Sequence, residues 1–245
     1  MTFDIALVAG ARPNFVKIAP ILRALEAGSE ASDQIRCRLI HTGQHYDHGM
    51  SQAFFDDLGI RQPDTNLGCG SGSQAEVTGN IMVAFERQLV EHPADLVLVV
   101  GDVNSTLACS VMAKKQGSLL AHVEAGIRSS DMSMPEEINR IVTDSLSDIF
   151  YTPSETANEN LRRVGVPEEK IVFVGNVMMD SLVGNLERLR QPPIWKEAGL
   201  EEGGYLVLTM HRPATVDDPA RVQGLLELIC RGTDLPIIFP VHPRT

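Results

Sequence analysis

The strongest constraint on the fold is a series of short, almost unbroken apolar runs rich in β-forming residues. Six of these runs occupy residues 5–9, 37–42, 96–100, 120–123, 149–152 and 171–174. A strand with one face in water alternates apolar and polar residues, whereas a strand covered on both faces is apolar throughout. The runs therefore predict parallel strands between two layers of helices, which is a doubly wound α/β sheet.

Helical periodicity fills the segments between these runs. One helix is predicted to begin after Arg12-Pro13 and another to cover residues 74–91, because apolar residues recur there every three or four positions. A third is predicted to run to Lys115, with Asn104-Ser105 as its N-terminal cap. Residues 67–73 (LGCGSGS) predict a flexible surface loop, since glycine is frequent in loops.

The 245 residues predict one complete domain and the beginning of a second. The first domain is expected over residues 1–176, followed by a connecting helix and linker over 177–193. A second domain is expected from residue 194 to 245, with strands at 205–210 and 236–241 around a helix. Two strands make too small a sheet for an independent α/β domain, so we expect the chain to end inside this domain.

Composition excludes several classes of partner. The net charge of −11 leaves no basic face for nucleic acid or an anionic membrane. The beginning of the chain has no leader pattern and no stretch is long enough to span a bilayer, so we expect a cytoplasmic protein. The four cysteines show neither disulfide nor zinc spacing, which predicts buried free thiols and no metal site.

The segment GARPNFVK (10–17) directly follows the first predicted strand. Gly10 permits a tight turn into the helix, and exposed amides at a helix start attract anions. Arg12 and Lys17 add charge for a phosphate group, or else they are ordinary surface cations. The segment matches neither the Walker pattern nor GxGxxG, so neither a nicotinamide site nor an ordinary ATP site is supported.

Histidines follow three of the other predicted strands. The segment HTGQHYD (41–47) could bind a nucleotide or sugar, with a hydrogen-bonded turn as the structural alternative. His211 and His242 end the two strands of the second domain, each beside a proline. Such His-Pro turns are usually structural, but two at equivalent strand ends favour a ligand cleft between the domains.

Three acids follow predicted strands or begin a helix. Asp102 and Glu124 come just after the runs 96–100 and 120–123, and Glu136 follows Pro135, one turn before Arg140 with which it is expected to pair. Carboxyl ends of parallel strands gather at one edge, so we expect the three acids to share a crevice. Crowded carboxylates push their pKa values apart, so one holds a proton while another removes one. Helix capping is the alternative role for Asp102 and Glu136.

Seven segments, taken together and in order, are similar to one enzyme family. GARPNFVKIAP, TGQHYD, GDVNST, HVEAGIRS, MPEEINR, TMHRP and FPVHPR resemble the non-hydrolysing UDP-N-acetylglucosamine 2-epimerases across nearly the whole chain. The resemblance implies a GT-B-like α/β fold, in which two Rossmann-like domains enclose the active site. It also implies interconversion of UDP-GlcNAc and UDP-ManNAc with no cofactor, neither NAD nor metal, and a homodimer.

The resemblance assigns roles to individual residues. Asp102, Glu124 and Glu136 are implied as catalytic carboxylates, and His211 as a further catalytic or diphosphate-binding group. The substrate-binding residues that it implies are Arg12, Lys17, His45 and Arg140. In the implied reaction UDP leaves as the C2 proton is removed, and it returns to the bound 2-acetamidoglucal with protonation on the opposite face. Two faces require two acid/base positions, and the departing diphosphate requires cations.

Some bacterial members of this family bind a second UDP-GlcNAc as an activator. Gln44, Arg212 and His242 belong to segments that suit such a site, although Asp47 stands where those members carry a second Gln. The family's uridine-holding segment, a Ser/Gly-rich loop with a nearby Glu, lies beyond Thr245. We therefore expect catalysis from a longer chain and reduced or absent activity from these residues alone.

Three other functions fit part of the pattern. A GT-B glycosyltransferase shares the fold but needs an acceptor site rather than acids on both faces of C2. A hydrolysing epimerase releases free ManNAc and UDP, so its products distinguish it. A non-catalytic nucleotide-sugar sensor needs only the phosphate and base contacts, and it would bind without turnover.

Overall fold

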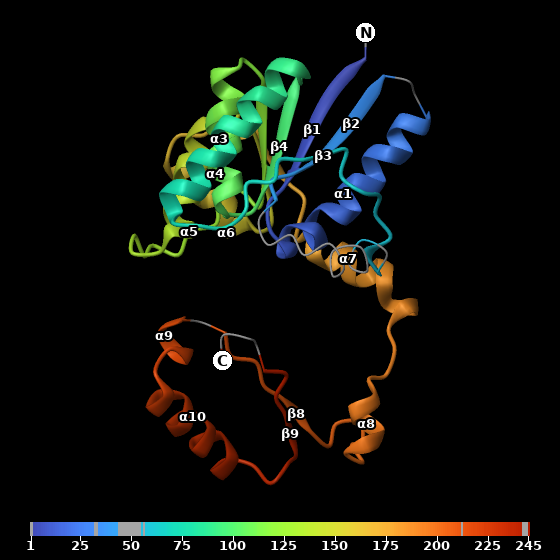
Figure 1. The fold of residues 1–245 in the computed structure, drawn as a ribbon, viewed down its shortest axis with the longest axis vertical. Coiled ribbons are helices and arrows are strands. Elements are labelled where there is room, and N and C mark those ends of the chain that lie inside the picture. The colour runs from blue at the N-terminus through green and yellow to red at the C-terminus, as the bar shows by residue number, and fades with distance from the viewer. Residues whose placement is uncertain (1, 32–33, 44–54, 56, 212, 242–244) are drawn as a thin grey trace. The chain divides into compact units, whose positions relative to one another are not determined.

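The computed structural model of the chain forms two compact units, Met1–Glu187 and Arg188–Thr245 (Figure 1). It describes residues 2–31, 34–43, 55, 57–211, 213–241 and 245, and only the backbone of residues 12, 29–31, 213 and 214. Each unit is considered by itself below.

A parallel sheet forms the centre of the first unit. Among the described residues its strands are β1 (Phe3–Ala9), β2 (Ile35–His41), β3 (Thr65–Asn66), β4 (Leu96–Val100), β5 (Leu119–Val123), β6 (Ile149–Thr152) and β7 (Ile171–Phe173). Their spatial order is β3-β2-β1-β4-β5-β6-β7. The chain first moves outward from β1 to β3 and then returns to add β4 on the other side of β1. The sheet therefore has its topological switch point between β1 and β4, and the predicted doubly wound arrangement is confirmed.

Helices cover both faces of this sheet (Figure 1). One face carries α1 (Arg12–Ala31) and α7 (Val177–Asn185), and the other carries α3 (Gln74–Glu91), α4 (Asn104–Lys115), α5 (Pro135–Leu146) and α6 (Glu155–Arg163). Short 3₁₀ turns occupy Glu168–Lys170 and Leu186–Arg188. The apolar runs of the sequence follow from this arrangement, because neither side of a central strand meets water.

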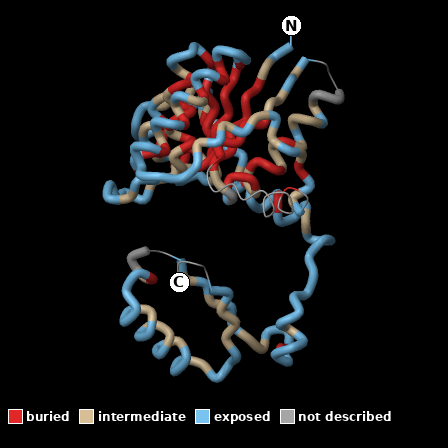
Figure 2. Tube along the Cα trace, in the orientation of Figure 1, coloured by how far each residue is buried: buried red, intermediate tan, exposed pale blue. Residues whose placement is uncertain are grey.

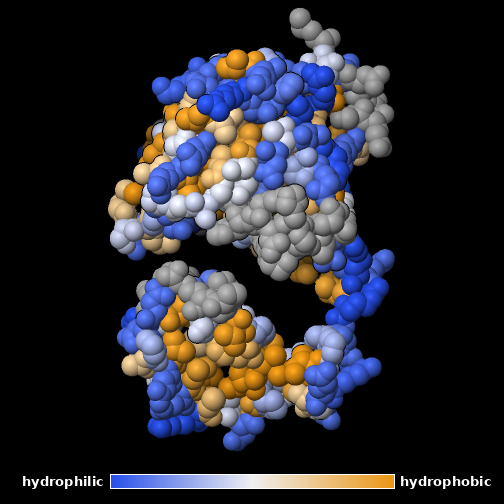
Figure 3. Space-filling view, in the orientation of Figure 1, coloured by the Kyte–Doolittle hydropathy of each residue, from blue (hydrophilic) through white to orange (hydrophobic). Residues whose placement is uncertain are grey.

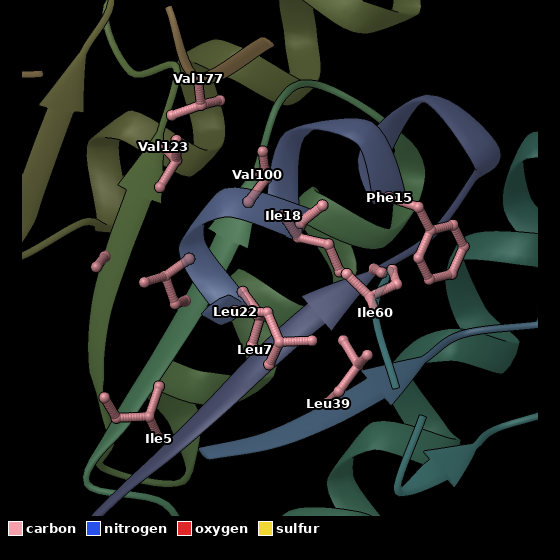
Figure 4. Packing of buried hydrophobic residues seen from close by; sticks show 14 of the residues in the cluster. Ile5, Leu7, Phe15, Ile18, Leu22, Leu39, Ile60, Val100, Val123 and Val177 are labelled. Carbon is pink, nitrogen blue, oxygen red and sulfur yellow. The ribbon is translucent and has the colours of Figure 1, made fainter. Parts of the chain in front are cut away.

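Alternate residues of β1 divide the core into two clusters. Ile5 and Leu7 pack with Ile18 and Leu22 of α1 (Figure 4). Val8 belongs to the cluster on the opposite face, with residues of α3 and α4. All five are at least 95% buried, and the buried positions concentrate along the sheet in Figure 2. Each such side chain contributes about 1.5–3 kcal/mol through removal from water, so these two clusters are the main source of stability.

The elements predicted for the first unit are confirmed with small changes at their ends, and one predicted cap is wrong. The N-cap of α4 is Val103, which makes no side-chain capping bond, because Asn104 is already the first helical residue. The Asn104 amide instead donates to Gln74 Oε1 at 2.7 Å. The glycine-rich loop ends in a capping box that starts α3, in which the Ser73 hydroxyl and the Glu76 carboxylate each accept from the other's backbone amide.

Helix α7 lies in the segment that we expected to connect the domains, and the structure places it in the first unit. Val177 joins the cluster packed against α1, and the Ser181 hydroxyl donates to the Val16 carbonyl. The compact unit therefore continues to Glu187, eleven residues past the expected end of the first domain at residue 176.

The second unit contains α8 (Pro193–Glu197), β8 (Leu206–Val207), α9 (Pro213–Val216), α10 (Pro219–Arg231) and β9 (Ile237–Ile238). The two strands pair in parallel but are much shorter than expected, because each has a single neighbour to hold its backbone. Leu200 and Val216 are the buried hydrophobic residues among those described in this unit. Figure 3 shows apolar side chains gathered on one face of this unit. Its exposed hydrophobic residues include Leu206, Val207 and Leu228.

The cysteines differ in their surroundings. Cys109 is buried in α4 and Cys37 and Cys69 are half-buried, but Cys230 is exposed on α10, so the prediction of buried thiols is wrong for Cys230. Few elements cover α10, which explains this exposure. Burial raises the pKa of the Cys37 thiol to about 11. Within the part of the chain that the structure describes, no helix has the length and apolarity needed to cross a membrane.

Candidate functional site

The ends of β1, β4 and β5 bring the predicted site residues to one edge of the sheet. Val100 and Val123, the last residues of β4 and β5, are paired in register and lie near each other in Figure 4. Glu124 follows Val123 directly, and Asp102 follows Val100 after one glycine. This edge lies next to the switch point between β1 and β4, where doubly wound sheets bind their ligands.

The turn between β1 and α1 is held by Asn14. Its side-chain oxygen accepts from the Gly10 and Ala11 amides at 3.3 and 3.0 Å, and its amide nitrogen donates to the Val100 carbonyl at 3.0 Å. The backbone amide of Asn14 donates to the Ala11 carbonyl. These three amides therefore have partners inside the turn, so anion binding at this helix start would depend on its cations.

Gly10 is required here by close packing. A Cβ atom on Gly10 would lie 2.1 Å from the Ser105 hydroxyl oxygen, which belongs to the first turn of α4. The same hydroxyl makes a 2.9 Å hydrogen bond with Thr42 at the end of β2. The glycine thus lets three neighbouring elements meet at the switch point.

Lys17 of α1 reaches across the edge and forms an ion pair with Glu124. Lys17 Nζ lies 2.5 Å from Glu124 Oε2, and the two side chains are 16% and 13% exposed. Gly101 packs above the pair in a left-handed conformation with φ of 72°, so a Cβ there would lie 3.2 Å from the lysine nitrogen. The pair is therefore largely shielded from water, which strengthens its electrostatic attraction.

Glu124 has an unusual backbone conformation. Its φ is 70°, in the left-handed region that non-glycine residues rarely adopt. Its amide is held by the Tyr151 carbonyl of β6 at 3.0 Å. Such local strain costs of order 1–3 kcal/mol and concentrates at functional positions, so it marks Glu124 as a candidate for chemistry.

Asp102 is held by α5 through two contacts. Its carboxylate pairs with the Arg140 guanidinium, and its backbone carbonyl accepts from the Asn139 amide at 2.8 Å. Arg140 also donates to Glu137 Oε2 at 2.9 Å. The expected pairing of Arg140 with Glu136 is therefore wrong, because Glu136 is exposed on the first turn of α5 while Glu137 is turned inward.

Glu137 is a buried carboxylate that the sequence analysis did not single out. It accepts from the amides of Ser129 and Ser130 at 2.9 and 3.0 Å as well as from Arg140. Burial opposes its ionisation, but the two amides and the guanidinium outweigh burial and lower the pKa of Glu137 to about 2. We call Lys17, Asp102, Glu124, Glu137 and Arg140 the edge cluster.

A network of buried polar groups lies next to the edge cluster and holds the backbone of Gly101. His122 Nε2 donates to the Gly101 carbonyl at 2.9 Å, and His122 Nδ1 lies 2.7 Å from Asp144 Oδ1. Arg128 pairs with the other oxygen of Asp144 at 2.6 Å. Burial opposes ionisation of Asp144, but His122 and Arg128 outweigh it and lower its pKa. The sequence signal that could have revealed this network is His122, a histidine inside an otherwise apolar strand.

The remaining predicted residues are placed as follows. Glu136 is exposed at the start of α5, and His211 is exposed in the second unit. Gln44, His45, Asp47, Arg212 and His242 lie outside the described residues, as does the side chain of Arg12. The structure thus brings Lys17 to Glu124 and Arg140 to Asp102.

Among the described residues, no three His, Cys, Asp or Glu side chains are grouped closely enough to hold one metal ion. In the edge cluster each carboxylate contacts a cation instead, Glu124 through Lys17 and both Asp102 and Glu137 through Arg140. Carboxylates beside cations can exchange protons with a ligand and hold an anionic group, without any bound metal being needed for either task.

Comparison with known proteins gives consistent matches. A sequence profile described as UDP-N-acetylglucosamine 2-epimerase matches residues 28–245. The chain is 40% identical over 248 residues to the UDP-N-acetylglucosamine 2-epimerase of Methanocaldococcus jannaschii, an alignment that covers 98% of this chain and 66% of that protein. It is 39% identical over 246 residues to the UDP-2,3-diacetamido-2,3-dideoxy-D-glucuronate 2-epimerase of Pseudomonas aeruginosa, with 98% and 67% covered.

Solved structures agree with these matches. The crystal structure of the M. jannaschii UDP-GlcNAc 2-epimerase in complex with UDP-GlcNAc and UDP has a TM-score of 0.85 and 38% sequence identity. That match covers 99% of this chain and 67% of the other. The GT-B-like α/β class is thereby confirmed, and the chain spans about two thirds of the length of the proteins it matches.

Proposed function

The chain belongs to the UDP-N-acetylglucosamine 2-epimerase family, and on this premise we propose that the complete protein interconverts UDP-GlcNAc and UDP-ManNAc. The observation that carries the proposal is the edge cluster, in which Asp102 and Glu124 each contact a cation at the switch point of the sheet. A UDP-GlcNAc complex of a structural relative supports the substrate class.

Glu124 and Asp102 are proposed as acid/base groups at C2 of the sugar. Epimerisation at C2 removes a proton from one face and returns one to the other, so it needs two positions for proton transfer. The two acids follow neighbouring strands and are held by different helices, α1 through Lys17 and α5 through Arg140. Separate supports suit two groups that approach one carbon from different directions.

Cations are proposed to assist the departure and return of UDP. Elimination transfers the C1–O bond electrons to the diphosphate, and a nearby positive charge stabilises the product of that step. Lys17 is the described cation closest to Glu124, and Arg12 at the start of α1 is proposed to join it. Glu136 and His211 are proposed as further contributors to the same reaction.

Re-formation of the sugar–UDP bond is proposed in preference to hydrolysis. The non-hydrolysing reaction returns UDP to the 2-acetamidoglucal, whereas a hydrolysing enzyme adds water to C1 and releases free ManNAc. The support is the resemblance of seven ordered sequence segments to those of the non-hydrolysing members. Product analysis separates the two reactions directly, since one yields UDP-ManNAc and the other yields ManNAc with UDP.

One observation favours a second candidate substrate. The Pseudomonas relative, named for a diacetamido-glucuronate nucleotide, is 39% identical, almost the same as the 40% of the UDP-GlcNAc enzyme. Epimerisation at C2 is common to both names. UDP-2,3-diacetamido-2,3-dideoxy-D-glucuronate is therefore proposed as the alternative substrate of the same edge cluster.

Incubation in deuterated water tests the proposal. The complete protein and each nucleotide sugar, in separate reactions, should give the C2 epimer with deuterium at C2, as observed by NMR and mass spectrometry. Deuterium enters because the removed proton exchanges with solvent before protonation on the opposite face. Recovery of both sugars unlabelled and unchanged would refute epimerase activity.

A further inference from the structure

Glu137 is a buried charge for which the proposed reaction has no direct use. It follows Glu136 in α5, yet it is 1% exposed whereas Glu136 is exposed. An ionised carboxylate is costly to bury unless several donors compensate it. The donors to Glu137 come from two different parts of the site, and this arrangement indicates what the residue does.

The first donors belong to the segment between β5 and α5. The amides of Ser129 and Ser130 both point to the Glu137 carboxylate, and Ser130 adopts a left-handed conformation with φ of 61°. Two consecutive amides directed at one carboxylate fold this segment back onto the first turn of α5. Glu137 is thereby fixed in place.

The other donor is Arg140, one turn further along α5. Its guanidinium lies between Glu137 and Asp102 and is 14% exposed. A guanidinium is a planar group with donors in a rigid fork, so a second carboxylate fixes both its position and the direction of its remaining donors. With Glu137 on one side, the fork presents Nη2 to Asp102 in one orientation.

We propose that Glu137 is a positioning residue for Asp102, acting through Arg140. Helix α5 already holds the backbone carbonyl of Asp102 through Asn139, and Arg140 holds its side chain. Glu137 fixes the orientation of that arginine. It also neutralises part of the Arg140 charge, so the guanidinium contacts two carboxylates instead of Asp102 alone. This inference rests on the proposed function, in which Asp102 is an acid/base group.

The test uses Glu137→Gln in the complete protein, which keeps the shape and removes the charge. We expect kcat for UDP-GlcNAc epimerisation to fall about 10- to 100-fold with KM within twofold, since misplacement of a catalytic group by about 1 Å has effects of that size. Glu137→Asp, which keeps the charge, should recover part of the loss. Asp131→Asn is the matched control, because Asp131 is an exposed carboxylate of the same segment that accepts from Ser133.

A double-mutant cycle separates positioning from general stability. If Glu137 acts through Asp102, Glu137→Gln should lower the residual rate of C2 proton exchange less than twofold in an Asp102→Asn background. A merely structural residue would lower the rate by the same factor in both backgrounds, and that additive result would overturn the inference. Circular dichroism of every variant confirms that the folded protein is compared.

Failure of the proposed function is distinguishable from failure of this inference. An active parent with an equally active Glu137→Gln variant would overturn the inference and leave the function standing. A parent without turnover on either nucleotide sugar would refute the function, and the crystal structure of Glu137→Gln then decides the inference. It requires that Arg140 has left its position beside Asp102, and an unmoved Arg140–Asp102 pair would overturn it.

Discussion

Glu124 combines two features that rarely coincide in one residue, a left-handed backbone and a shielded ion pair. The backbone conformation aims its side chain toward α1, where Lys17 meets it at 2.5 Å. The ion pair with Lys17 holds this carboxylate in one position at the edge of the sheet. A substitution at this position should therefore affect chemistry far more than ligand affinity.

Glu124→Gln should abolish deuterium incorporation at C2, with turnover reduced at least ~100-fold, because the amide keeps the shape but has no basicity. Binding of UDP, measured by calorimetry, should stay within about threefold of the parent. Glu91→Gln, at the exposed end of α3, is the control for a neutral Glu-to-Gln change. Parental turnover in the Glu124 variant would remove this residue from the mechanism.

Glu137 also makes stability depend on pH. Its folded-state pKa of about 2 lies below the ordinary value of 4.5, so ionised Glu137 stabilises the fold above about pH 4.5. That contribution should be lost as the pH falls from 4.5 toward 2. Urea unfolding across this range should show a decline in the free energy of unfolding of the parent and a smaller decline in Glu137→Gln. At neutral pH the variant should be less stable than the parent by about 3 kcal/mol. Identical pH slopes in the two proteins would contradict the assigned pKa.

At the scale of elements, the junction of β1, β2 and α4 depends on one missing side chain. Gly10→Ala places a methyl group 2.1 Å from the Ser105 hydroxyl oxygen and 2.7 Å from Ser105 Cβ. We expect this overlap to lower the free energy of unfolding by about 2–3 kcal/mol. Thermal and urea unfolding of the first unit measure the loss.

Two further variants make the Gly10 prediction specific. Ser105→Gly removes both clashing atoms, so Gly10→Ala should cost much less stability in a Ser105→Gly background than in the parent. Gly28→Ala in α1 is the control, because a Cβ there meets nothing within 4 Å, and alanine should stabilise the helix by about 0.5–1 kcal/mol. An equal cost of Gly10→Ala in the two backgrounds would show that the Ser105 contact is not the cause.

The strands and most helix positions could be predicted because their patterns are local. The apolar run 96–100 and the dipeptide Gly101-Asp102 mark the end of β4 without reference to any other part of the chain. The same logic placed Glu124 after β5. The predicted cap at Asn104 failed because asparagine suits both a cap and a first turn, and only the packed structure distinguishes them.

The partners within the site could not be predicted because they join distant parts of the chain. Lys17 and Glu124 are 107 residues apart, and Arg140 and Asp102 are 38 apart. The inward turn of Glu137 depends on Ser130 in a left-handed conformation, and the local sequence SSDMSM has no glycine to signal it. Acidic residues at a helix start are favoured there by the helix dipole and are usually exposed. The sequence therefore offers no reason to expect that Glu137, rather than Glu136, is buried.

At the scale of the whole chain, the two units should differ greatly in their resistance to opening. The first unit buries two hydrophobic clusters around its sheet, whereas the second has two short strands and few buried side chains. Amides of β4 and β5 should exchange with deuterium about 1,000-fold or more slowly than those of β8 and β9, because opening free energies follow local burial. Exchange of the 245-residue chain followed by mass spectrometry measures this ratio, and equal protection would contradict it.

Because the strands are parallel, the site residues lie at the rim formed by the carboxyl ends of the strands. The opposite rim, at their amino ends, is available for attaching a label or a surface. Turns that enter the strands lie on this opposite rim, among them Gln116-Gly117 between α4 and β5, where Gly117 has open space around it. A fluorophore or surface anchor inserted there would be separated from Glu124 by the whole length of β5, which is about 16 Å for five residues. Immobilised or labelled protein made in this way would carry its attachment at the opposite end of the strands from Asp102 and Glu124.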